Sequence, residues 1–156
     1  VTIYGSGNDT DETRAQIAKI KGIFEDEAIF THFIPEPDWS NTPLTEETAG
    51  SWLHSERGKV GELPVKVEGD YGISHRFKST NIADDRWYDW RLQNWDTKWD
   101  AYEVSIDDDD PDQLEVSFET AWSPPEAICH AMREQYPDLS VSWFYDEPGM
   151  EIAGYL

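Results

Sequence analysis

The residues of this chain that could do chemistry are chiefly carboxylates, and most of them fall in its second half. Residues 79–156 hold 19 Asp and Glu against 4 Lys and Arg, whereas residues 1–78 hold 14 against 8. In two segments, 102–107 and 114–119, acidic and serine residues alternate with apolar ones. Successive side chains of a strand point to opposite faces, so we expect these carboxylates to share one sheet face, where they can bind cationic groups.

A run of aspartates joins the two alternating segments. Asp107, Asp108, Asp109 and Asp110, with Asp112, offer oxygen ligands for a hard cation such as Ca²⁺ or Mg²⁺. The run has neither the alternating ligands nor the glycine of an EF-hand loop, and consecutive acids cannot all converge on one ion. We interpret it as a solvated turn and predict no cofactor and no metal. The candidate partner-binding residues are Glu103, Asp107, Asp108, Asp109, Asp110, Asp112, Glu115 and Glu119.

Nucleophilic catalysis has little support in this sequence. Cys129 is the only cysteine, so neither an internal disulfide nor a Cys-rich zinc site can form. His130 follows it directly, but neighbours on a helix point about 100° apart, so the pair is no catalytic dyad. No H-x-x-x-H, G-x-S-x-G, P-loop or G-x-G-x-x-G motif occurs. We expect a buried structural cysteine and no enzymatic activity.

The net charge argues against some classes of binding partner. The formal net charge of the 156 residues is -21, which would repel the phosphates of nucleic acids and of anionic membranes. No apolar run approaches the roughly 20 residues of a membrane span. We expect one cytoplasmic domain, no direct nucleic-acid or membrane binding, and a residue or short piece removed ahead of Val1.

The first third of the chain reads as strand, helix and strand. Val1–Tyr4 has the composition of a strand, and Asp9-x-x-Glu12 resembles a capping box at a helix start. Apolar residues then recur at helical spacing as far as Phe24, and Gly22 is expected to close this helix. The apolar run Ala28–Ile34 is expected to form the second strand.

Residues 35–98 are expected to form an insertion packed on the domain, because their few aliphatic residues would make a poor core of their own. We expect a short helix over 45–54 and a short strand over 63–67. A longer helix is predicted from Asp84 to Trp99. Its stripe of Tyr88, Leu92, Trp95 and Trp99 is expected to be buried.

The rest of the chain predicts a hairpin, a helix and two strands. Alternation over 102–107 and 114–119 indicates the hairpin, with Tyr102, Val104 and Ile106 facing inward. Ser123-Pro124-Pro125-Glu126 is typical of a helix start, with Ser123 as the cap. Without the insertion the order is β-α-β-β-α-β. This order predicts an α+β, ferredoxin-like two-layer sandwich with an antiparallel sheet, an insertion between its second and third strands, and an extra C-terminal strand.

Four short motifs carry a resemblance to a known family. They are residues 87–91 (WYDWR), 94–101 (NWDTKWDA), 120–125 (TAWSPP) and 145–150 (YDEPGM), followed by Ala153-Gly154. The chain resembles the YubB-type proteins of phages, plasmids and integrating elements, densely over 87–154 and loosely over the first 37 residues. The resemblance implies a ferredoxin-like fold and a mobile-element origin, and no catalytic mechanism. The family pattern has glycine where this chain has Asp96, a position suited to a left-handed helix end.

Together these observations lead to one functional hypothesis. We expect a non-enzymatic accessory protein whose carboxylates imitate a nucleic acid, and which binds and inhibits a host nucleic-acid-binding defence protein, such as a CRISPR effector or a restriction enzyme. The mobile-element resemblance suggests this class of target. The partner would present a basic nucleic-acid-binding surface.

The same residues are also compatible with different roles. The acidic face could serve solubility alone, or reflect a salt-adapted proteome. The clustered carboxylates could serve a metal-dependent enzyme. The tryptophans could stack bases or anchor a protein-interaction or oligomerisation module.

Overall fold

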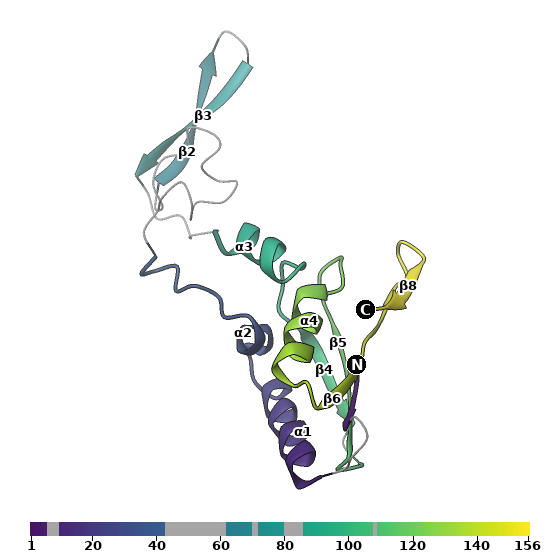
Figure 1. Cartoon of the computed structure of the whole chain (residues 1–156). Helices are drawn as coiled ribbons and strands as arrows, with labels where there is room; N and C mark the ends of the chain where they lie inside the picture. The colour runs from purple at the N-terminus through teal and green to yellow at the C-terminus, as the bar shows by residue number, and fades with distance from the viewer. Residues whose placement is uncertain (6–9, 43–61, 70–71, 80–85, 108) are drawn as a thin grey trace. The chain divides into compact units, whose positions relative to one another are not determined.

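The structure, a computed structural model, contains a four-stranded antiparallel sheet in the order β4-β5-β1-β6 (Figure 1). The structure describes residues 1–5, 10–42, 62–69, 72–79, 86–107 and 109–156. It divides into two compact units, residues 1–35 with 91–156, and residues 36–90. We call the first the sandwich unit.

The elements of the sandwich unit confirm the predicted fold class. Its sheet strands are β1 (Thr2–Gly5), β4 (Tyr102–Asp107), β5 (Gln113–Glu119) and β6 (Leu139–Ser142). Its principal helices are α1 (Asp11–Phe24), between β1 and β4 in the chain, and α4 (Glu126–Gln135), between β5 and β6. Among these four strands, β1 is the first in the chain and lies between the third, β5, and the last, β6. These connections and this strand order are those of a ferredoxin-like α+β sandwich.

The prediction of a second strand over Ala28–Ile34 is wrong, because this segment contains the short helix α2 (Ile29–Phe33). Ile29, Phe30 and Phe33 are all buried, a spacing that one helical face provides. The Asp100 carboxylate accepts a hydrogen bond of 3.0 Å from the backbone N–H of Phe30, in the first turn. The second strand of the sandwich is therefore β4, and the inserted residues lie before this strand in the chain.

One face of the sheet and the inner faces of the helices form the core. Ile3 of β1 and Leu114 of β5 are fully buried, as are Ile20 of α1 and Ile128 of α4. Contacts of α1 with β1 and β5, and of α4 with β6, hold the helices against this face. Aromatic rings extend the core, with Phe118 within 6 Å of three other rings, those of Phe24, Phe30 and Trp143.

The ends of α1 differ from the prediction. Thr10 is the N-cap, and Thr10 and Thr13 form the capping box that was expected at Asp9 and Glu12. The helix also continues past Gly22 to Phe24, because Ile23 and Phe24 are buried and extend its apolar face.

The start of α4 is capped from a distant segment. The helix begins at Glu126, and the preceding Pro125 makes no side-chain cap. The backbone N–H of Ala127 donates instead to the Asp96 carboxylate at 2.9 Å, while the Ser123 hydroxyl donates to the Asp96 carbonyl. The expected Ser123 cap is thus wrong. Asp96 has φ 64, so the left-handed position is kept without glycine.

The inserted residues include α3 (Arg86–Asn94), and the hairpin of β2 (Glu62–Gly69) and β3 (Gly72–Ser79). The strand expected over 63–67 lies in β2, whereas the helix expected over 45–54 lies outside the described residues. The helix expected up to Trp99 ends at Asn94, which places the fully buried Trp95 beyond it and leaves Leu92 and Trp99 exposed. That the insertion packs on the domain stays a prediction.

The chain closes with a two-stranded sheet, formed by β7 (Phe144–Glu147) and β8 (Ile152–Tyr155). Tyr145 lies opposite Gly154, where a Cβ atom would come within 3.2 Å of its ring. Glycine at this position therefore lets the ring lie against the neighbouring strand.

Candidate protein-interaction surface

The sheet face that the core leaves free carries carboxylates. Alternation along β5 buries Leu114 and Val116 and exposes Glu115, Ser117 and Glu119. On β4, Ser105 and Asp107 are exposed. We call Asp107, Glu115 and Glu119, with Ser105 and Ser117 between them, the acidic sheet face.

Two carboxylates of this face lie directly opposite each other. Asp107 of β4 pairs in register with Glu115 of β5, an arrangement of like charges that destabilises a sheet. None of the four strands of this sheet contains Lys or Arg. The Lys and Arg residues of the sandwich unit lie on helices or in a connection, and they are Arg14, Lys19, Lys21, Arg91, Lys98 and Arg133. The strands thus supply no cation to neutralise the acidic sheet face.

A β-bulge brings an aromatic residue to the same face. Glu103 has φ 51, and the pairing shifts between Tyr102 and Ser105, so that Tyr102 pairs with Glu119. Paired residues share a face, so the prediction that Tyr102 faces inward is wrong. Desolvation, together with a hydrogen bond to Glu119, raises the pKa of the Tyr102 hydroxyl.

Exposed tryptophans lie near Tyr102, at the start of β4. The Trp99 ring lies 6.0 Å from that of Tyr102, and the Lys98 ammonium lies 4.5 Å from the Trp99 ring and 3.7 Å from the Trp122 ring. Trp122 is 70% exposed and Trp99 47%. We call these four residues the aromatic cluster. The predicted stripe suggested burial of Trp99, and no periodicity in the sequence distinguished Trp122.

The comparisons with known proteins concern this part of the chain. Residues 94–156 match the family model described as "Ferredoxin-like domain in Api92-like protein". The match spans β4 to β8, so it includes the acidic sheet face, the aromatic cluster and the final hairpin. No curated protein and no solved structure matches the chain.

The ferredoxin-like fold is therefore supported by both the strand order and the family model. The YubB-type resemblance and the mobile-element origin stay predictions. No helix in the described part of the chain is long and apolar enough to cross a membrane.

The aspartate turn beside the acidic sheet face is held mostly by local hydrogen bonds. Asp107 and Asp110 each accept one from a backbone N–H two residues ahead, at 3.4 and 2.9 Å. Asp112 accepts from the Arg14 guanidinium at 2.6 and 3.0 Å, which holds the pKa of its carboxyl below the usual range. Asp112 is thus paired with α1, apart from the other candidate residues. Asp109 is exposed, and Asp108 lies outside the described residues.

The lone cysteine has the environment of a structural residue. Cys129 is fully buried, and desolvation raises the pKa of its thiol, which opposes the thiolate form that a nucleophile needs. Among the residues that the structure describes, no three His, Cys, Asp or Glu are placed so that they could hold a metal ion.

Proposed function

We propose that the ferredoxin-like domain is a non-catalytic binding module whose acidic sheet face docks on the basic, nucleic-acid-binding surface of another protein. The observation that carries this proposal is the pairing of Asp107 with Glu115 on a sheet whose strands contain no cation. This pairing costs stability, and a cationic partner would convert the cost into attraction.

The spacing of the carboxylates suits such a partner. Neighbouring strands lie about 4.8 Å apart and same-face residues about 7 Å apart, intervals comparable with the separation of phosphates along a nucleic-acid strand. Serine hydroxyls between the acids add hydrogen-bonding groups. The proposed target is a nucleic-acid-binding protein. More specifically, we propose a host defence protein of the CRISPR-effector or restriction type.

Affinity capture from host lysate tests the proposal with two variants of equal charge change. Asp107→Asn, Glu115→Gln and Glu119→Gln together remove the acidic sheet face. Glu12→Gln, Glu27→Gln and Glu134→Gln remove three exposed carboxylates elsewhere in the sandwich unit. We expect the natural chain and the second variant to retain a basic nucleic-acid-binding protein, released by about 0.5 M salt and by competing DNA, and the first variant to lose it. Equal retention by both variants, or a partner indifferent to DNA, would contradict the proposal.

A second candidate function rests on the aromatic cluster. Exposed tryptophans are efficient anchors of protein interfaces, and Lys98 lies against both rings. If the cluster supplies most of the affinity, Trp122→Ala will abolish capture at any salt concentration, whereas loss of the acidic sheet face will chiefly slow association.

A further inference from the structure

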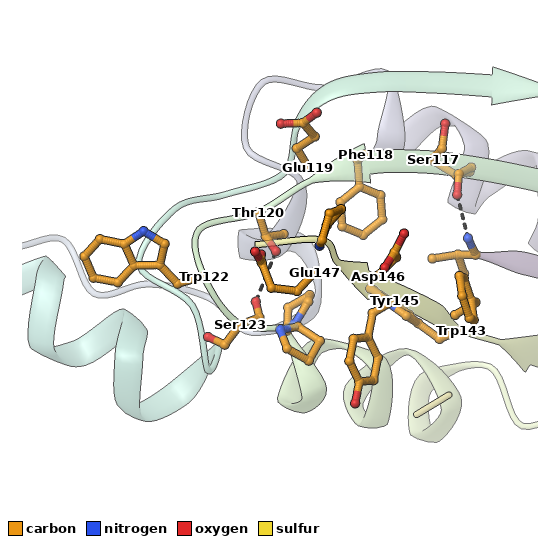
Figure 2. A pocket seen from close by; sticks show the side chains of 16 residues that line it. Ser117, Phe118, Glu119, Thr120, Trp122, Ser123, Trp143, Tyr145, Asp146 and Glu147 are labelled. Atoms are coloured by element: carbon orange, nitrogen blue, oxygen red, sulfur yellow. Dashed lines mark hydrogen bonds between the residues drawn. The ribbon is translucent and has the colours of Figure 1, made fainter. Parts of the chain in front are cut away.

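Trp122 combines two features that do not favour folding. Its side chain is 70% exposed, and its backbone has φ 68, a left-handed conformation that bulky residues rarely adopt. Figure 2 shows the indole projecting from the connection between β5 and α4, away from the other labelled side chains. Residues held in such strained conformations cluster at functional sites, where the strain serves binding or catalysis.

Hydrogen bonds on both sides hold Trp122 in this conformation. Before it, the hydroxyl of the fully buried Thr97 donates to the Ala121 carbonyl at 3.0 Å and accepts from the Ala121 N–H at 3.2 Å. After it, the Ser123 carbonyl accepts from the Thr120 hydroxyl at 3.1 Å (dashed line in Figure 2). The ring therefore projects from a fixed turn, which reduces the conformational entropy lost when it binds a partner.

A cation already lies against the exposed rings. The Lys98 ammonium is 3.7 Å from the centroid of the Trp122 ring and 4.5 Å from that of Trp99, both within the distance of about 6 Å at which an aromatic face attracts a cation. Lys98 and Trp99 directly follow Thr97, so the hydrogen bonds that fix Trp122 also link the two segments that carry the rings. The aromatic cluster is thus arranged to hold a cationic group, while most of the Trp122 ring stays in solvent.

The aromatic cluster adjoins the acidic sheet face. The Tyr102 ring lies 6.0 Å from that of Trp99, and Tyr102 pairs in register with Glu119 of the acidic sheet face. The Tyr102 hydroxyl also donates a hydrogen bond to the Glu119 carboxylate. Aromatic rings and carboxylates therefore follow one another on one continuous surface.

We propose that this continuous surface binds arginine side chains of the partner in preference to lysine side chains. The inference rests on the proposed function, because the arginines belong to the basic surface of that partner. A guanidinium group is planar and weakly hydrated, so it can stack on an indole ring, and its N–H groups can pair with a carboxylate. A lysine ammonium is a compact, strongly hydrated charge without a planar face. The carboxylates thus attract both residues, and the rings select arginine.

A second copy of this chain is a less suitable occupant of the surface. Each copy has a formal net charge of -21, so two copies repel each other. The acidic sheet face would also meet carboxylates of the same sign. Charge complementarity therefore favours a basic partner.

Binding of two synthetic peptides to the full chain tests the inference. The peptides have equal length and charge, with either arginine or lysine alternating with serine. We expect calorimetry at low ionic strength to show about tenfold tighter binding of the arginine peptide. Removal of the acidic sheet face by Asp107→Asn, Glu115→Gln and Glu119→Gln together should weaken the binding of both peptides.

Two single variants assign the preference to the aromatic cluster. Trp122→Gly should abolish it, and glycine retains the turn because it adopts a positive φ without strain. Tyr155→Ala is the matched control, since Tyr155 is 74% exposed on β8 and lies outside the cluster. This control should bind the arginine peptide as tightly as the natural chain.

Four results would overturn the inference. Equal affinity of the natural chain for both peptides contradicts it, and leaves the proposed function standing if loss of the acidic sheet face weakens both. Binding of neither peptide contradicts the proposed function as well. An unchanged preference in the Trp122→Gly variant places the selectivity elsewhere. A dimer in light scattering that Trp122→Gly dissociates would identify a second copy as the occupant.

Discussion

The Asp107–Glu115 pair yields the most direct prediction, because its two charges lie opposite each other on an exposed face. Two carboxylates ~6 Å apart in water repel by about 0.7 kcal/mol, within the range of about 0.2–1 kcal/mol for cross-strand pairs. We therefore expect Asp107→Asn or Glu115→Gln to raise the free energy of unfolding by about 0.5 kcal/mol at low ionic strength.

A double-mutant cycle measured by urea denaturation separates this repulsion from other effects of the substitutions. Once one charge is gone, removal of the second should add almost nothing. In about 1 M salt, where the Debye length is about 3 Å, the coupling should vanish. The measurement is best made on an acetylated chain, because Glu115 also acts on the Val1 ammonium group. Loss of stability in either variant, or a coupling unchanged by salt, would refute the reasoning.

Three other predictions concern single residues. Asp96→Ala should lower the free energy of unfolding by about 1–2 kcal/mol, since it removes the cap on Ala127 at a left-handed position, whereas Asp96→Asn should change it little. Asp112→Asn should destabilise the chain at neutral pH, because the carboxyl pKa is lowered on folding by Arg14; the difference from the natural chain should disappear as pH falls below 3.8, the ordinary value. Cys129 should react with a thiol reagent at the rate of unfolding, and a fast reaction in the folded protein would contradict its burial.

Local alternation predicted the hairpin and the strands of the core well. Leu114 and Val116 of β5 are buried and Glu115 is exposed, as the period of two requires. The same reasoning failed over Ala28–Ile34, because a short apolar run fits a buried strand and a buried helix equally well. The tertiary contact of Asp100 with Phe30 has no signal in the local sequence.

The candidate surface was predictable only in part. The exposure of Asp107 and Glu119 follows from the alternation of residues along the strands. Tyr102 shares their face because of a β-bulge, which no residue in the local sequence predicts. Trp122 is exposed and has a positive φ of 68, a backbone conformation that a bulky residue rarely adopts and that its residue type does not predict. The partner of Asp112 comes from α1, far away in sequence, so the pairing could not be deduced from the aspartate turn.

The cap on α4 affects the order in which the domain folds. Asp96 lies 31 residues before the amide that it caps, so a peptide spanning α4 alone has no such acceptor at its start. The helix gains this hydrogen bond only after the connection between α3 and β4 has reached it. Formation of the N-terminal cap of α4 is thus coupled to a long-range contact. If α4 forms before this contact, it forms without the cap.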